Sequence, residues 1–359
     1  MRPGFLWYSV PVKKSFWDNL QKPFFALAPL ANVTDAAFRY IIAKYSKYGG
    51  RDIARGSKES LPAEALRAGG PDVLFTEFVS ADGLLSKGRD ILLKDLLYSE
   101  SERPIVAQLF TAHPDKMEEA GKLIAKLGFD GLDINMGCPD RAVEKQGAGA
   151  ALIKNPKRAR ELIRAAKESG LPVSLKTRLG YNKDELETWL PELLAETPTA
   201  ITIHARTRKE MSKVPARWER VKRAVEIRNA LKSETLILGN GDVTDMKDAR
   251  QKAEESGADG VMLGRAIFGN PWLFANSSRL NLESGTRFNL SINEKLAVMV
   301  EHTKLFEELL GEIKNFAIMK KHYKAYANGF DGAKELRIKL MEAENAAEVE
   351  NIVNNFLME

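Results

Sequence analysis

The sequence predicts an α/β protein: a closed barrel of eight parallel strands, (β/α)8, followed by a small C-terminal helical domain. Three observations lead to this fold class. Short segments rich in β-branched and aromatic residues alternate with amphipathic helical segments, which is the pattern of parallel βα units. Eight such strand-like segments can be counted, which favours a closed TIM barrel over an open sheet. Such a barrel uses about 250 residues, so a chain of 359 residues has room for a smaller domain beside it.

The individual elements follow from these patterns. Strands are expected, in chain order, at residues 24–30, 73–79, 104–110, 131–137, 173–179, 200–206, 235–241 and 260–266. Helical patterns lie between them, for example at residues 114–127, 156–169, 218–231 and 244–256. After residue 285 the alternation stops, and helical periodicity continues over residues 292–310, 313–326, 333–341 and 347–356. We therefore predict a barrel domain with an N-terminal extension over residues 1–285 and a helical domain over residues 286–359.

Composition limits the class of protein. Hydrophobic residues make up 44% and charged residues 29% of the chain, as in a globular protein with a large core. The single cysteine excludes an intrachain disulfide framework and a multi-thiolate zinc site, and fits a cytoplasmic protein. The apolar stretch at residues 5–12 is too short for a membrane span, so we expect it to cap the barrel. A net charge of +5 tilts toward an anionic partner, although so small an excess over so long a chain is more often ordinary solvated surface.

Polar residues recur where the predicted strands end. Buried strands are normally apolar throughout, and the C-terminal ends of barrel strands are where active sites are assembled. Taken singly, His204 is explained as a core histidine, Lys176 as an ion-pair partner and Gln108 as a loop anchor. Their coincidence at one end of the barrel favours an organised site. The residues concerned are Pro29, Glu77, Gln108, Asn135, Cys138, Lys176, His204, Asn240, Gly264 and Arg265.

The ends of the seventh and eighth strands suit a phosphate group. Gly239–Asp242 and Gly264–Arg265 each lead toward a helix, where backbone N–H groups and an arginine bind phosphate, although glycines also serve simply as turn residues. Lys176 and His204 would place cations beside an anionic ring such as reduced flavin. No Gly-x-Gly-x-x-Gly motif follows a strand, so a mononucleotide fits better than a dinucleotide. The histidines lack ligand spacing, and no metal is expected.

The sharpest local motif is Asp-Ile-Asn-Met-Gly-Cys-Pro at residues 133–139. A free cysteine is usually a small buried hydrophobic residue. Cys138 lies instead between glycine and proline, in a turn at the end of a strand, which indicates exposure. An unperturbed thiol, with a pKa of about 8.5, is protonated at neutral pH and suits a general acid. A nucleophile would need a neighbouring base, and the sequence shows none.

With these motifs in place, the chain resembles the tRNA-dihydrouridine synthases, a family that depends on flavin mononucleotide (FMN). The resemblance covers most of the chain, and the cysteine motif is its most specific part. The matching segments are residues 28–39, 133–139, 175–180, 202–208, 240–242 and 257–266.

The resemblance implies a function and a set of site residues. FMN is reduced by NADPH, passes a hydride from N5 to C6 of a uracil in tRNA, and Cys138 protonates C5. Glu77, Asn135, Arg178 and Arg206 face the uracil and the RNA. The predicted FMN-binding residues are Pro29, Leu30, Ala31, Gln108, Lys176, His204, Asn240, Gly241, Asp242, Gly264 and Arg265.

The resemblance also gives the C-terminal helices a role. Basic residues gather there with interleaved tyrosines. On the residues alone a solvated helix face is the better interpretation, and only the resemblance to the family's C-terminal helical domain favours tRNA binding. No membrane and no obligatory protein partner are expected. The residues are Lys314, Lys320, Lys321, His322, Tyr323, Lys324, Tyr326, Lys334, Arg337 and Lys339.

Two segments depart from the family pattern. Asn32 stands where a glycine is usual, and Leu30 replaces a methionine; asparagine tolerates left-handed backbone geometry, so the turn is expected to persist. Residues 46–71 form a long first connection. Two other functions remain open on the residues: a flavin barrel that reduces a small molecule, and a barrel-derived RNA-binding protein without catalysis.

Overall fold

The computed structural model describes residues 15–47, 69–275 and 291–359. The expected N-terminal cap at residues 5–12, most of the long connection 46–71 and the domain boundary at residue 285 lie outside these ranges. The predicted division into two domains therefore stays a prediction.

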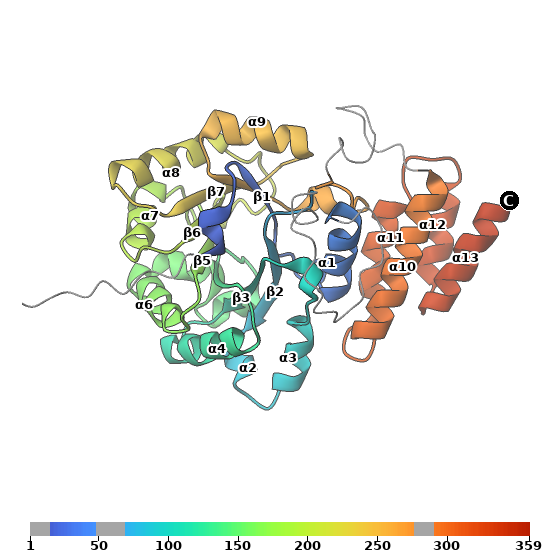
Figure 1. Cartoon of the computed structure of the whole chain (residues 1–359), viewed down its shortest axis with the longest axis horizontal. Coiled ribbons are helices and arrows are strands. Elements are labelled where there is room, and N and C mark those ends of the chain that lie inside the picture. Colours follow the sequence, from blue (N-terminus) through green and yellow to red (C-terminus); the bar gives the residue numbers. More distant parts are fainter. Residues whose placement is uncertain (1–14, 48–68, 276–290) are drawn as a thin grey trace, which may run out of the picture.

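The described chain forms an eight-stranded parallel sheet that curls into a barrel (Figure 1). Its strand order is β1-β8-β7-β6-β5-β4-β3-β2. The barrel closes between β1 and β2, where the N–H of Leu27 donates to the carbonyl of Val73 at 3.0 Å. The strands are β1 (Phe24–Leu27), β2 (Leu74–Ser80), β3 (Ile105–Phe110), β4 (Gly131–Met136), β5 (Val173–Arg178), β6 (Ala200–His204), β7 (Leu236–Asn240) and β8 (Gly260–Leu263). The predicted (β/α)8 barrel is confirmed.

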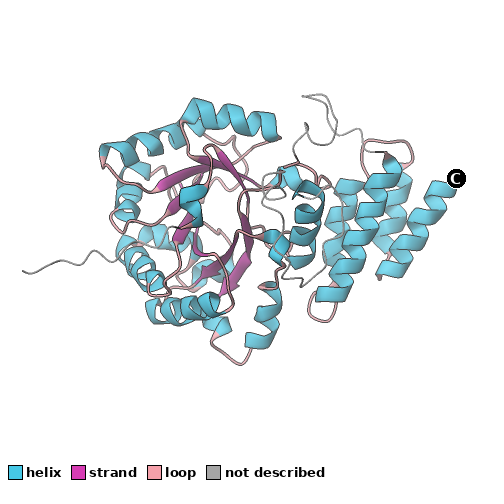
Figure 2. Cartoon of the chain, viewed as in Figure 1, coloured by secondary structure: helices cyan, strands magenta, loops and turns pink. Residues whose placement is uncertain are grey.

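Helices cover the outside of the barrel (Figure 2). Local sequence explains where several of them begin and end: Pro156 occupies the first turn of α6, the Asn155 side chain accepts from the N–H of Arg158, and Gly257 ends α9 with a φ of 69°. The helices up to β8 are α1 (Ala36–Ile42), α2 (Ala81–Leu84), α3 (Arg89–Asp95), α4 (Pro114–Lys126), α5 (Arg141–Lys145), α6 (Pro156–Lys167), α7 (Leu186–Leu194), α8 (Trp218–Ala230) and α9 (Met246–Ser256).

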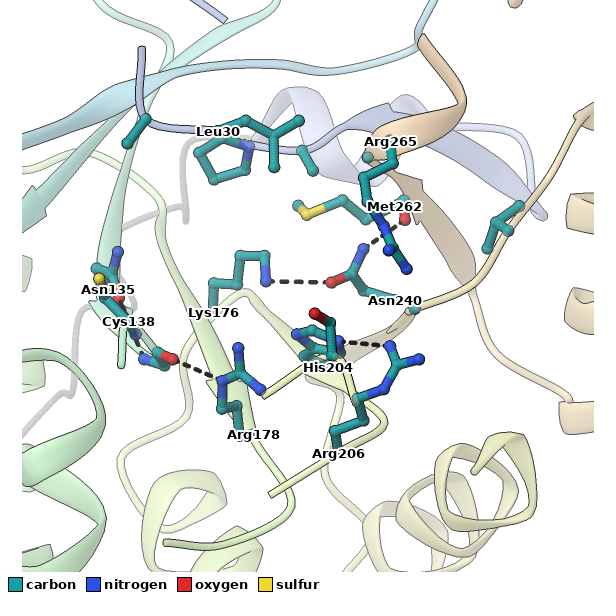
Figure 3. A pocket seen from close by; sticks show the side chains of 18 of the residues that line it. Leu30, Asn135, Cys138, Lys176, Arg178, His204, Arg206, Asn240, Met262 and Arg265 are labelled. Atoms are coloured by element: carbon teal, nitrogen blue, oxygen red, sulfur yellow. Dashed lines mark hydrogen bonds between the residues drawn. The ribbon is translucent and has the colours of Figure 1, made fainter. Parts of the chain in front are cut away.

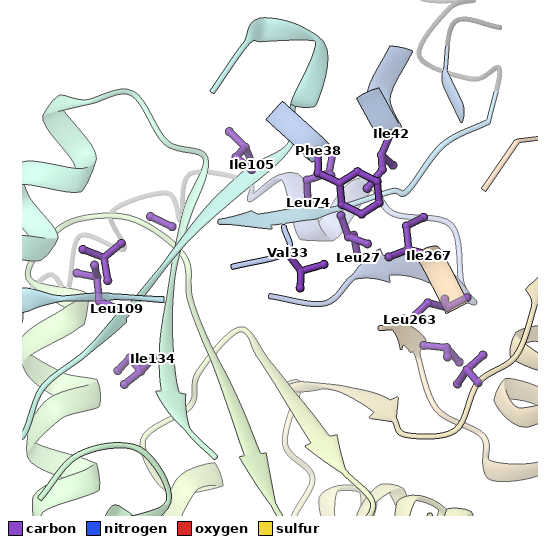
Figure 4. Packing of buried hydrophobic residues seen from close by; sticks show 14 of the residues in the cluster. Leu27, Val33, Phe38, Ile42, Leu74, Ile105, Leu109, Ile134, Leu263 and Ile267 are labelled. Carbon is purple, nitrogen blue, oxygen red and sulfur yellow. The ribbon is translucent and has the colours of Figure 1, made fainter. Parts of the chain in front are cut away.

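Strand alternation divides the side chains between two cores. Leu27, Leu74, Ile105 and Ile134 point outward and pack with the helices (Figure 4). Residues of opposite parity point into the barrel, where a second apolar cluster fills the N-terminal half. Members of that cluster are Trp17, Phe24, Ala26, Ala28, Val73, Phe75, Val106, Ala200, Leu238 and Met262. The polar residues at the C-terminal strand ends share this inward parity, so they converge above the apolar layer.

Beyond β8, four helices of the described chain pack side by side next to α1 (Figure 1). They are α10 (Ile292–Leu310), α11 (Lys320–Tyr326), α12 (Ala333–Glu342) and α13 (Ala346–Met358). The single helix predicted at residues 313–326 is wrong in detail. Asn315 caps a short 3-10 helix, η8 (Phe316–Met319), by accepting from the N–H of Ala317 at 2.8 Å, and α11 starts after it.

The predicted basic and aromatic surface on these helices is partly wrong. His322, Tyr323 and Tyr326 are buried, because they lie on the inner stripe of α11 rather than on its solvent face. These aromatic rings therefore contribute to the core and offer no stacking surface to RNA bases. Lys324 and Lys334 are exposed and remain available to an anionic partner.

No helix within the described ranges combines the length and the apolar character needed to cross a membrane.

Candidate active site

A cavity of about 720 Å³ opens at the C-terminal end of the barrel (Figure 3). Its size is in the range of small-molecule and cofactor sites. Every predicted site residue except Glu77 lines it: Pro29, Leu30, Ala31, Gln108, Asn135, Cys138, Lys176, Arg178, His204, Arg206, Asn240, Gly241, Asp242, Gly264 and Arg265. Residues from all parts of the barrel sequence thus meet in one cleft.

The turn that carries Cys138 is held by its own neighbours. The amide oxygen of Asn135 accepts from the N–H groups of Gly137 at 3.1 Å and Cys138 at 2.9 Å. Gly149 packs against the same turn with a φ of +61°, and a Cβ there would lie 2.8 Å from the carbonyl oxygen of Cys138. This close approach requires glycine. The thiol therefore has a defined position at one side of the cavity (Figure 3).

Burial raises the pKa of the Cys138 thiol, and the backbone N–H of Asp140 and the charges of Arg178 and Lys176 offset only part of this rise. The apolar surroundings are Phe78, Phe110, Val143 and Ala148, which pack beside the thiol. Removal from water disfavours the charged thiolate. The thiol is accordingly protonated at neutral pH, as a proton donor must be.

Asp133 supports this wall of the cavity from below. Its carboxylate is fully buried and accepts from Gln108 Nε2 at 2.7 Å and from Ser174 Oγ at 2.6 Å. Gln108 Oε1 in turn accepts from Asn135 Nδ2 at 3.0 Å. Burial raises the pKa of Asp133 to about 6. Asp133 belongs to the 133–139 motif but was not predicted as a site residue. Its position, an acidic residue on the inward face of a strand, could have indicated a role in the site.

Lys176 stands in the middle of the cleft. Its Nζ donates to Asn240 Oδ1 at 3.2 Å, and Asn240 Nδ2 donates to the carbonyl of Met262 at 2.8 Å. Burial lowers the pKa of Lys176 to about 8, and the neighbouring Arg178 lowers it further. The ammonium group is thus oriented by β7 and β8, and it would gain from an anionic ligand.

His204 faces a cluster of cations. Arg206 Nη1 lies 3.2 Å from His204 Nε2, while another guanidinium nitrogen of Arg206 pairs with Asp242. Burial, followed by the charges of Lys176 and Arg178, lowers the pKa of His204 far below its ordinary value. The expectation that His204 supplies a positive charge is therefore wrong: it is a neutral hydrogen-bonding group at physiological pH.

The far side of the cavity fits a phosphate group. Arg265 is held by Asp242 at 2.7 Å, while its side chain remains 65% exposed at the rim. Gly241 lines the cavity with a φ of +126°, and a Cβ there would lie 2.8 Å from that of Ala216, so this corner requires glycine. An arginine beside a glycine turn is a donor set that a phosphate takes. The residues present fit an anionic mononucleotide.

Several lining residues were missed by the sequence analysis. Met262 lies two positions before Gly264 on the inward face of β8, so strand alternation could have indicated it. Phe78 could not be found in this way, because the β2–β3 register shifts between Phe75 and Phe78. Ser212 and Thr244 also line the cavity. They lie in connections that follow β6 and β7, and no local pattern distinguished them.

Glu77 lies outside the lining of the cavity. One carboxylate oxygen accepts from the N–H of Asn32, and the other pairs with Lys314. Asn32 has a φ of 53°, which confirms the expected left-handed turn at this position. Glu77 therefore contacts the back of the 29–31 segment rather than the cavity itself.

Comparison with known proteins identifies the family of the chain. The model of the dihydrouridine synthase family matches residues 26–359. The probable tRNA-dihydrouridine synthase of Staphylococcus aureus (strain MRSA252) is 38% identical over 348 residues, 96% of each chain. Probable tRNA-dihydrouridine synthase 2 of Bacillus subtilis (strain 168) is 37% identical over 346 residues, covering 96% of this chain and 97% of the relative.

Among solved structures, histamine dehydrogenase from Rhizobium sp. 4-9 shares the fold. The TM-score is 0.51 at 14% identity, over 78% of this chain and 48% of that one. The match of the family model to nearly the whole chain, together with relatives of this similarity, decides the family. The chain belongs to the dihydrouridine synthase family.

Proposed function

We propose that this protein binds FMN in the barrel cavity and reduces uridines in tRNA to 5,6-dihydrouridine, with NADPH as the reductant. Three findings support the proposal: membership of the dihydrouridine synthase family, relatives whose names specify tRNA, and a cleft that joins a phosphate corner, a central lysine and a protonated thiol. The convergence of Lys176, Arg265 and Cys138 on one cavity carries most of the weight.

The lining of the cavity supports a set of residues proposed to hold FMN. Arg265 and the backbone around Gly241 and Gly264 would bind the phosphate, and the ring would lie between the segment Pro29–Ala31 and the central side chains Gln108, Lys176, His204 and Asn240. When bound, the flavin supplies a hydride from N5 to C6 of uracil, using electrons from NADPH. Lys176 would stabilise the negative charge that reduction places on the ring.

Cys138 is proposed as the acid that protonates C5 of the uracil. Its turn is fixed by Asn135, and burial raises its pKa, so the proton is present at neutral pH. General acid catalysis of this kind contributes about 10²- to 10⁴-fold in rate. The side chains that pack beside the thiol, Phe78, Phe110, Val143 and Ala148, are apolar and offer no base that would convert it into a nucleophile.

The target base must leave its stack to enter the cavity, which costs a few kcal/mol that RNA contacts have to offset. Arg178 and Arg206 are proposed to face the base and its backbone, together with Asn135. Lys324, Lys334 and Lys339 are exposed on the C-terminal helices and are proposed to contact phosphates of the tRNA. With tRNA as the substrate, we place the reaction in the cytoplasm.

The decisive experiment combines a spectrum with an RNA assay. Purified protein should be yellow, its flavin should be reduced by NADPH, and it should restore dihydrouridine to tRNA from cells that lack the gene. Cys138→Ser should keep the flavin spectrum and lose nearly all turnover. Lys304→Met serves as a control, because Lys304 pairs with Glu350 on the exposed side of α10.

Other outcomes would point elsewhere. A colourless preparation with no change in tRNA would support RNA binding without catalysis. Flavin reduction with turnover of free uracil, and none of tRNA, would support a small-molecule reductase. Normal turnover by Cys138→Ser would remove Cys138 from the mechanism.

A further inference from the structure

We propose that Lys314 is a positioning residue for the cofactor cavity: through Glu77 it braces the turn at Asn32, and so fixes the 29–31 wall against the flavin. The inference rests on the proposed function. It assigns to the C-terminal helices a part in shaping the active site, in addition to contact with RNA.

The turn at Asn32 borders the wall of the cavity. Pro29, Leu30 and Ala31 line the cavity, and the next residue, Asn32, has a φ of 53°. Asparagine tolerates this region better than most residues with a Cβ but less well than glycine, so contacts from neighbouring residues help to hold the turn. On one side the N–H of Leu30 donates to Thr34 Oγ1 at 2.8 Å. On the other, the N–H of Asn32 donates to Glu77.

Glu77 is in turn held by Lys314. Glu77 is 5% exposed, and its second carboxylate oxygen pairs with Lys314 Nζ. Lys314 also pairs with Asp95, at the end of α3, at 2.8 Å. The side chain of Lys314 is 10% exposed, so both ion pairs are shielded from solvent. Removing one member of a shielded pair leaves an uncompensated charge.

The surroundings make Lys314 the central cation of this cluster. Asp35 is fully buried nearby, and its pKa is raised to about 6 by burial and then by the charge of Glu77. The charges of Glu77 and Asp35 also act on Lys321. Without Lys314, Glu77 would face Asp35 and Asp95 with less compensation, and would be pushed away from the Asn32 N–H.

The position of Lys314 depends on the C-terminal helices. It lies between α10 and η8, and α10 packs along α1, where the rings of Phe38 and His302 stack with centroids 4.8 Å apart. The same helices that carry exposed lysines therefore deliver a buried lysine to the rear of the cavity wall. A shift of these helices would move Lys314 and Glu77, and so would alter the position of Asn32 and of the 29–31 segment.

The test measures FMN affinity by fluorescence quenching and kcat and KM with tRNA. Lys314→Met should weaken FMN binding by about tenfold or more and lower kcat, because the turn loses its brace, while KM for tRNA stays near the wild-type value. Lys314→Arg should retain most of the affinity. Lys304→Met, an exposed ion-pair residue on α10, should behave as wild type.

A second substitution separates bracing from general damage. Asn32→Gly removes the Cβ that strains the turn, so in the Lys314→Met background it should recover a large part of the lost FMN affinity. If Lys314→Met does not fold, Glu77→Gln, which keeps an acceptor for Asn32, should show the same loss in milder form and the same recovery.

Three results would overturn the inference: wild-type FMN affinity in Lys314→Met, a rise in KM for tRNA alone, or no recovery by Asn32→Gly. The first would show that the turn needs no brace, and the second would make Lys314 an RNA contact. A wild-type protein that binds no FMN would instead defeat the proposed function itself, and the inference with it.

Discussion

The amide oxygen of Asn135 accepts a hydrogen bond of 2.9 Å from the backbone N–H of Cys138. A side chain of β4 thereby sets the turn that presents the thiol, and the amide group of Asn135 is itself held by Gln108. The position of Cys138, the proposed proton donor, is thus decided by strand residues rather than by a mobile loop. This relationship can be tested separately from the thiol.

Asn135→Ala should lower turnover with tRNA much more than it lowers FMN content. The substitution leaves the N–H groups of Gly137 and Cys138 without their acceptor, an expense of about 1–3 kcal/mol in the free energy of unfolding. Asn155→Ala is the matched control, because it removes a similar cap from α6, away from the cavity. Thermal melting and tRNA assays of both variants are the measurements. Equal activity losses in the two would contradict a specific role for Asn135.

Lys176→Met should stabilise the unliganded protein and weaken FMN binding. The lowered pKa of Lys176, about 8, reflects burial of its charge, so removal of that charge should raise the free energy of unfolding by about 1–2 kcal/mol at pH 7. The same change removes the cation proposed for the reduced ring, and the flavin midpoint potential should fall. Melting without FMN and a redox titration with FMN give the two readouts. A destabilised, FMN-free variant would instead point to a structural role.

Asp133→Asn should be mild and Asp133→Ala severe. An asparagine can still accept from Gln108 Nε2 and can donate to Ser174 Oγ, so the network stays satisfied. Alanine leaves Gln108 and Ser174 without acceptors, and the free energy of unfolding should fall by about 1–3 kcal/mol or more. Urea unfolding and FMN content measure the difference. Similar losses in the two variants would show that the charge of Asp133, rather than its hydrogen bonds, is required.

The stability of the protein should fall as the pH drops below about 6.5, the usual pKa of an unfolded histidine. Burial lowers the pKa of His302 to about 3 and that of His322 well below its ordinary value. Below about pH 6.5 these histidines bind protons in the unfolded chain but not in the folded chain. Each histidine therefore lowers the free energy of unfolding by up to about 1.4 kcal/mol per pH unit. Asp133, with its pKa raised to about 6, acts in the opposite direction.

His302→Leu isolates this effect. The variant should show a shallower decline of the unfolding free energy between pH 7.5 and 5.5 than the wild type, whatever its absolute stability. Urea unfolding at both pH values provides the comparison. Parallel declines in the two proteins would mean that His302 is protonated in the folded state or that other groups dominate.

Local sequence patterns were sufficient for the barrel and for most of its rim. The alternation of apolar and polar residues places Gln108, Asn135, Lys176, His204 and Asn240 on inward faces of successive strands, and the strand period of two depends on neither partners nor distance along the chain. The left-handed turn at Asn32 was likewise predictable from the residue type.

Burial and charge state were not predictable in the same way. His204 is neutral because it is buried and because cations face it: Lys176 and Arg178 come from β5, and Arg206 lies just after β6. Tyr323 and Tyr326 are core residues because α11 turns that stripe toward its neighbours. The charge state of His204 and the burial of the two tyrosines both depend on residues from other elements that pack against them. The sequence of a single strand or helix does not specify those neighbours.

The sequence by itself determined the two-residue alternation of the strands, the left-handed turn at Asn32 and the polar groups at the strand ends. Each of these features depends only on residues that are close together in the chain. Glu77 lies near the end of a strand, like the residues that line the cavity. Only the tertiary structure decided that its side chain turns away from the cavity and pairs with Lys314, 237 residues later in the chain. A contact over that distance is made by the packing of α10 against α1, and no local pattern encodes it.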